Sequence, residues 1–127
     1  NQNEEKIAAD VKEFYPLPDE KRLVILKNDG VLEIYYLENY EEDVREIKGT
    51  TSKILESKNI SEFKKIDDLP NYFLALSGSD LILSEFDPRE PLNYQILETD
   101  VKKYFLEKKN LYILKGNGEL LKTQLEF

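Results

Sequence analysis

Two apolar segments joined by a short turn of Gly, Asn, Ser and Asp occur three times in this chain, at residues 23–35, 72–83 and 111–121. This pattern predicts antiparallel β-hairpins, because such turn residues tolerate the positive φ angles that tight turns require. In the first hairpin, Asp29-Gly30 fits a type I′ turn. The three turns hold four of the five glycines. Glycine therefore serves turn geometry here, and the glycine-rich loop of the usual phosphate-binding spacing is missing.

A second pattern precedes each hairpin, and it consists of an apolar residue, a basic residue, any residue and an apolar residue. Its copies are residues 11–14, 63–66 and 101–104, and each copy begins at a similar distance ahead of the hairpin turn. A fourth copy at residues 44–47 precedes a smaller hairpin that turns at residues 57–59. The recurring order and spacing indicate a degenerate internal repeat.

Together these patterns predict an all-β fold of about twelve short antiparallel strands. All five prolines fall near the expected gaps, where a missing N–H does not interrupt a ladder. The strands group into three four-stranded, blade-like repeats at residues 11–48, 52–86 and 93–125. The expected strands are residues 11–15, 22–28, 31–38, 44–48, 52–57, 60–66, 71–77, 80–86, 93–97, 101–106, 110–115 and 118–125.

Val101-Lys102-Lys103-Tyr104, followed by Leu111–Leu114 and then by Gly118-Glu119-Leu120, resembles consecutive strands of one blade in β-propeller repeat proteins. The nearest repeats are those of the chromosome-condensation-regulator and quinoprotein types. The resemblance implies a partial or half β-propeller over most of the chain, and it implies no functional residue. The Trp-Asp, Gly-His and double-glycine motifs of other propeller repeats are absent from the sequence. Three units leave two sheet edges to be covered. A second copy would complete six units, or the chain is a fragment of a longer propeller, or it folds as a different closed β-domain.

A helical pattern competes with strands at three places. Residues 4–15 place Ile7, Val11 and Phe14 on one helical face, and the segments 61–66 and 100–108 each start at a residue that can cap a helix. Helices at all three places would give an α+β fold with three helix–hairpin repeats. Because the second and third segments are short, we expect strands there. The expected organisation is a polar N-terminal tail at residues 1–10, able to form a helix, and a single β-repeat domain at residues 11–127.

The composition excludes several kinds of chemistry. The chain contains no Cys, His, Met or Trp, which excludes disulfides, Ser-His-Asp triads and the usual zinc and iron ligands. We therefore expect neither a metal nor another cofactor. The chain has 26 acidic and 18 basic side chains and a net charge of −8, so we do not expect nucleic acid as a partner. No apolar run is long enough for a transmembrane helix.

The chain begins at Asn1 with a polar segment. Such a segment would suit a tether behind a removed leader, as in bacterial lipoproteins, and on that interpretation the protein is extracytoplasmic and membrane-tethered. An arbitrary boundary of the sequence explains the same observation.

Tyrosine supplies the candidate binding residues. The chain has eight tyrosines and six phenylalanines, many of them at expected strand positions. Adjacent aromatic residues on a strand point to opposite faces, so one ring of each pair is expected to pack inward and the other to point outward or toward a neighbouring sheet. An outward tyrosine is a good anchor for a protein or a carbohydrate, although cross-strand packing explains the same residues. The candidate binding residues are Tyr35, Tyr36, Tyr40, Tyr72 and Tyr112.

We therefore expect a non-enzymatic protein-interaction or assembly module that uses sheet edges and outward aromatic residues, with a protein partner or a second copy bound there. Two alternatives remain open. A carbohydrate-binding module would show an exposed aromatic platform. A carboxylate-based glycoside hydrolase would need two convergent acids, one with a raised pKa, but acidic segments such as Glu41-Glu42-Asp43 and Asp67-Asp68 follow no specific catalytic or calcium-binding spacing.

Overall fold

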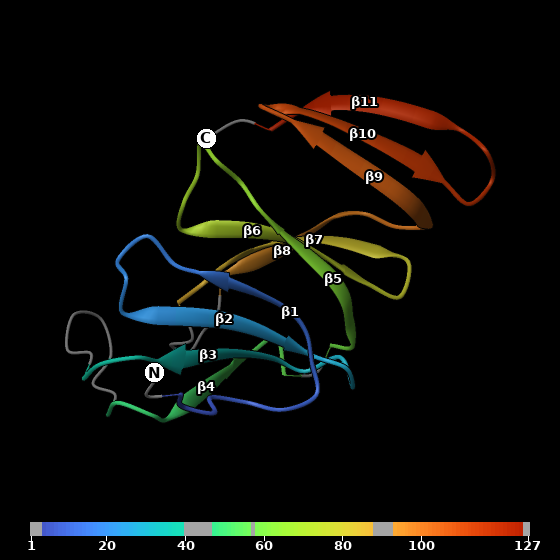
Figure 1. The fold of residues 1–127 in the computed structure, drawn as a ribbon. Helices are drawn as coiled ribbons and strands as arrows, with labels where there is room; N and C mark the ends of the chain where they lie inside the picture. The colour runs from blue at the N-terminus through green and yellow to red at the C-terminus, as the bar shows by residue number, and fades with distance from the viewer. Residues whose placement is uncertain (1–3, 40–46, 57, 88–92, 126–127) are drawn as a thin grey trace. The chain divides into compact units, whose positions relative to one another are not determined.

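A computed structural model describes residues 4–39, 47–56, 58–87 and 93–125 (Figure 1). These residues form eleven β-strands and no helix, which confirms the all-β prediction. Strands β5 and β9 replace the two short helices of the α+β alternative, and residues 4–10 are not helical. The strands are β1 (Val11–Pro16), β2 (Arg22–Lys27), β3 (Leu32–Tyr36), β4 (Thr51–Ile54), β5 (Ile60–Lys65), β6 (Tyr72–Ser77), β7 (Asp80–Glu85), β8 (Tyr94–Glu98), β9 (Val101–Glu107), β10 (Asn110–Lys115) and β11 (Leu120–Gln124).

The strands form three antiparallel sheets, each a meander of consecutive strands. The first sheet is β1-β2-β3-β4, the second is β5-β6-β7-β8, and the third is β9-β10-β11. In the parts of the chain described here, no helix is long and apolar enough to cross a membrane.

The grouping of strands into sheets differs from the expected grouping by one strand. Residues 52–57 were expected to open the second repeat, but β4 pairs with β3 in the first sheet. Likewise β8, expected to open the third repeat, pairs with β7 in the second. The reason is that β4 and β8 return to their partners after connections longer than a tight turn, so local turn residues do not reveal the pairing. Most of the strand expected at residues 44–48 lies outside the described residues.

The first and third hairpins close with the same turn. Gly30 and Gly118 have φ angles of 89° and 94°, and their amides donate to the carbonyl oxygens of Lys27 and Lys115 at 3.0 Å. The type I′ turn expected at Asp29-Gly30 is wrong, because Asp29 does not adopt a positive φ. The arrangement is that of a type I turn followed by a left-handed glycine. The Asp29 carboxylate supports it by accepting the amide of the residue two positions on, at 3.1 Å.

The beginnings of the first and third sheets also match. Asp10 and Asp100 have φ angles of 58° and 55°, and their carbonyl oxygens accept the amides of Asn28 and Gly116 at 2.8 Å. Immediately beyond each of these aspartates, the strand pairing shifts by one residue. The internal repeat inferred from the sequence is therefore present in the backbone geometry of these two sheets.

The second sheet shows the same register shift, between Ile60 and Glu62. The pairing makes Ile60–Phe63 the structural counterpart of Val11–Phe14 and Val101–Tyr104. The sequence pattern had instead matched Phe63–Ile66 to those segments. That match is three residues out of phase, because Ser61 stands where the other two copies have a lysine.

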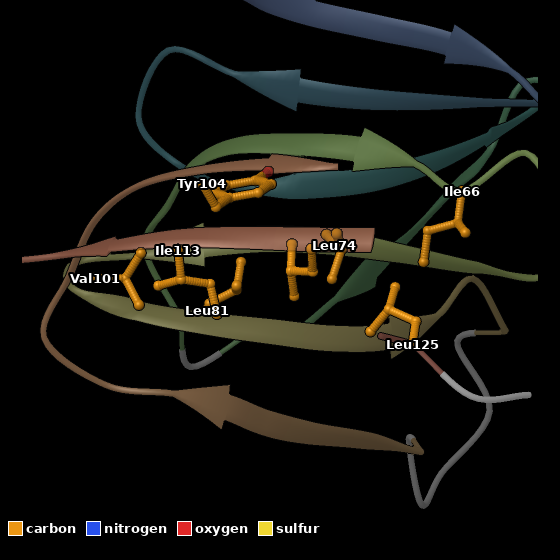
Figure 2. Close-up of a cluster of buried hydrophobic side chains, with 8 residues drawn as sticks. Ile66, Leu74, Leu81, Val101, Tyr104, Ile113 and Leu125 are labelled. Atoms are coloured by element: carbon orange, nitrogen blue, oxygen red, sulfur yellow. The ribbon is translucent and has the colours of Figure 1, made fainter. Parts of the chain in front are cut away.

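The chain divides into two compact units. The first sheet belongs to the first unit, and the second and third sheets belong to the second. In the first unit, the two inner strands β2 and β3 carry buried apolar side chains on both faces of the sheet. In the second unit, Leu74 and Leu81 of the second sheet pack in one cluster with Tyr104 and Ile113 of the third sheet (Figure 2). The other members of this cluster are Ile66, Val101, Leu111 and Leu125.

Candidate functional site

The outer face of the third sheet carries a patch of exposed and half-buried apolar side chains. We define it by Phe105, Tyr112, Leu114 and Leu120. The strand register places Phe105 opposite Tyr112 and Leu114 opposite Leu120, on the face away from Tyr104 and Ile113. Phe105 is 60% exposed and Leu120 is 70% exposed. Because large apolar side chains rarely gather in the open on a monomer, this patch is a candidate contact surface.

Two lysines border this outer face. Lys122 lies opposite Tyr112 in the strand register, and its Nζ is 5.9 Å from the centre of the tyrosine ring. Lys103 lies opposite Leu114. Positive charges beside an apolar strand keep it soluble when it is uncovered and offer sites for acidic groups of a partner.

Strand β11 gives this face a free edge. Among the described residues, β11 pairs with β10 and with no strand on its other side. All five of its residues are exposed, including Leu121, which points toward the core side of the sheet. The corresponding strands of the other sheets, β3 and β7, are each covered by a fourth strand. An uncovered strand of this kind presents backbone N–H and C=O groups on which another chain can pair.

A second candidate surface is a groove in the first unit. It has a volume of about 600 Å³ and lies between the segment 5–8 and strands β1 and β2. Phe14, which is 65% exposed, and Ile7 line this groove, and so does the buried Ile25. Lys6 and Lys12 bring positive charge to the lining and Glu5 brings a negative one. The groove can therefore receive apolar side chains at an edge of the first sheet.

The structure leaves few of the predicted tyrosines free for a partner. Tyr35 and Tyr36 point to opposite faces, as expected for adjacent strand residues, but both are buried. The Tyr36 hydroxyl donates to Ser52 Oγ at 3.1 Å. Gly49 lies close to the Tyr35 hydroxyl, at a position where an added Cβ would be 3.9 Å away. Both faces of β3 are therefore covered at these positions, and neither ring is exposed to a partner.

Of the remaining three candidates, two have described positions. Tyr72 is half-buried and packs against the core cluster of the second unit, and its hydroxyl accepts a hydrogen bond from Asn93 Nδ2 at 3.0 Å. Tyr112 lies on the outer face of the third sheet. Tyr40 lies outside the described residues. Among the predicted tyrosines with described positions, Tyr112 is therefore the one that lies on a candidate contact surface.

Sequence reasoning missed Phe105, Leu120 and Phe14. Phe105 carries a usable signal, because it follows Tyr104 in a strand and adjacent strand residues face opposite ways. Leu120 and Phe14 carry no such signal. Their sequence patterns match those of buried residues in the other repeats, and only the surroundings of each strand distinguish them.

Glu98, on strand β8, forms an ion pair with Lys115. Glu98 accepts a hydrogen bond from Lys115 Nζ at 2.7 Å, and this bond, together with the lysine charge, lowers the pKa of the Glu98 carboxyl. A glycosidase acid requires the opposite shift. Among the residues with described positions, no group of three or more acids is arranged to hold a metal ion. The segment Glu41-Glu42-Asp43 lies outside the described residues.

No protein-family model and no curated protein sequence matches this chain.

Proposed function

We propose that this chain is a non-catalytic protein-interaction module whose contact surface is the outer face of the third sheet, continued by the free edge of β11. The observation that carries the proposal is the joint exposure of Phe105 and Leu120 on a sheet whose edge strand β11 pairs, among the described residues, with β10 alone. Aromatic anchors surrounded by aliphatic side chains are typical of the centre of protein interfaces. The unpaired backbone of β11 adds a means of binding an extended segment by main-chain hydrogen bonds.

A carbohydrate-binding module is a second candidate. It is supported by the neighbouring rings of Phe105 and Tyr112, which lie opposite each other in the register. Lys122 beside Tyr112 could donate a hydrogen bond to a sugar. The flanking Leu114 and Leu120 favour a protein partner, because aliphatic side chains offer a sugar no hydrogen bonds.

Site-specific photo-crosslinking in cells of the source organism tests the proposal. The crosslinker p-benzoylphenylalanine replaces Phe105, and in a matched control it replaces Lys64, which is exposed on the second sheet. We expect a discrete protein adduct from position 105 and none from position 64. Excess unlabelled wild-type protein should compete for the adduct, whereas a Phe105→Asp/Leu120→Asp double variant should not.

The absence of a protein adduct from position 105 would refute the proposal, and so would equal labelling from both positions. Glycan binding that depends on Tyr112, without any protein adduct, would favour the carbohydrate-binding module.

A further inference from the structure

The internal repeat gives every sheet two kinds of face. The strand registers make Phe14, Phe63 and Tyr104 equivalent, and we call the face that carries these residues the aromatic face. On the opposite side, the registers make Leu32, Leu81 and Leu120 equivalent, and we call this the leucine face. The outer face of the third sheet defined above is its leucine face.

The second unit shows how the two kinds of face pack. Leu74 and Leu81 lie on the leucine face of the second sheet, and they share one buried cluster with Tyr104 and Ile113 on the aromatic face of the third sheet (Figure 2). Leu81 is fully buried and Tyr104 is 6% exposed. The leucine face of one sheet is therefore a natural cover for the aromatic face of another.

Among the described residues, two faces are open at the position that is buried in the second unit, although Ile25 and Tyr35 on the first of these faces are buried. On the aromatic face of the first sheet, Phe14 is the counterpart of Tyr104 and is 65% exposed. On the leucine face of the third sheet, Leu120 is the counterpart of Leu81 and is 70% exposed. One of these two open positions lies on an aromatic face and the other on a leucine face. Inside the second unit, a leucine face and an aromatic face pack on each other and bury the equivalent residues.

We propose that the chain associates head to tail with a second copy, with the leucine face of the third sheet in one molecule packing on the aromatic face of the first sheet in the next. The groove beside Phe14, with the apolar Ile7 and Ile25 in its lining, receives the side chain of Leu120. This inference rests on the proposed function and names a second copy as its partner. Because the two contact surfaces differ, repetition of the contact gives a closed ring or an open chain of molecules, according to the rotation between copies.

The experiment is sedimentation analysis of the purified 127-residue chain between about 5 μM and about 1 mM, the range in which weak specific contacts become populated. We expect the wild-type protein to associate as its concentration rises. Phe14→Asp and Leu120→Asp each place a charge in the contact, and each should raise the dissociation constant at least about tenfold. Ile47→Asp is the matched control, since Ile47 is 71% exposed and belongs to no strand, and it should associate as the wild type does.

Mixing the two variants gives the decisive result. Phe14→Asp leaves the leucine face of the third sheet intact, and Leu120→Asp leaves the aromatic face of the first sheet intact. An equimolar mixture should therefore form a one-to-one complex that grows no further, although each variant alone is monomeric. Unchanged circular dichroism spectra verify that the variants are folded, which is expected because both side chains are exposed.

A monomeric wild type over the whole range would overturn the inference. Association that survives either substitution would do so too, and so would a mixture that fails to form the complex. These failures are distinguishable from failure of the proposed function. A crosslink from position 105 to a protein of different mass would retain an interaction module without self-association, whereas an absence of any protein adduct would remove both.

Discussion

Leu81 and Leu120 occupy equivalent positions in the second and third sheets, yet their surroundings differ completely. Leu81 is fully buried in the core cluster of the second unit, whereas Leu120 is 70% exposed. Truncating each to alanine removes the same atoms from the same place in the repeat. The difference between the two losses in free energy of unfolding therefore measures what covers each face.

The expected magnitudes follow from this burial. Leu81→Ala removes a buried side chain and leaves a cavity, which costs about 2–5 kcal/mol. For a chain of this length, that loss lowers the Tm by about 8–20 °C. A leucine side chain contributes about 1.5–3 kcal/mol when fully buried, so the mostly exposed Leu120 should cost about 0.5 kcal/mol and roughly 2 °C.

Urea denaturation followed by circular dichroism measures both losses, at about 5 μM so that self-association does not add stability. The two residues belong to the same compact unit, so their losses are read from the same transition. A cost above about 2 kcal/mol for Leu120→Ala would refute the reasoning, because it would mean that the leucine face of the third sheet is covered within one molecule. A cost below about 1 kcal/mol for Leu81→Ala would equally contradict the assigned core.

Three further substitutions test individual contacts. Gly118→Ala should lose about 1–2 kcal/mol in urea denaturation, because its φ of 94° strains any side chain although the surrounding space is open; no loss would argue against the left-handed turn. Tyr36→Phe should lose about 1 kcal/mol with its hydrogen bond to Ser52, and an unchanged transition midpoint would disagree with that bond. Because Lys115 lowers the pKa of Glu98, their ion pair stabilises the fold at neutral pH, and this contribution should fade as the pH falls through and below 4.5. Glu98→Gln should therefore flatten this part of a plot of unfolding free energy against pH. A plot unchanged from the wild type would contradict the lowered pKa.

Local sequence features predicted the parts of the fold that depend on neighbouring residues. The three hairpins follow from paired apolar segments with Gly, Asn, Ser and Asp at the turns between them, and such a signal acts within a few residues of the chain. The turn type at Gly30 escaped prediction, because two-residue and three-residue turns use similar residues and differ in backbone angles. The grouping of the strands into sheets was not predicted either, because β4 pairs with β3 only after a long connection in the chain.

The sequence indicated the type of residue at the candidate site, an outward aromatic side chain, but not which aromatic residues are exposed. An outward aromatic residue was expected, and Tyr112 is one. Tyr35 and Tyr36 were expected on the same ground, but the structure buries both. Strand alternation tells which residues share a face of a sheet, but it does not tell whether another part of the molecule lies on that face.

The sequence by itself determined that this chain forms β-hairpins in a repeated order and that it lacks histidine and cysteine chemistry, because both follow from residue identity and short-range geometry. Only the tertiary structure decided that Tyr104 is buried whereas Phe14 is exposed, and that Leu81 is buried whereas Leu120 is exposed. Residues at equivalent positions of a repeat carry nearly the same local signal. Their exposure depends on whether another sheet lies over them, and that is set by contacts between segments far apart in the chain.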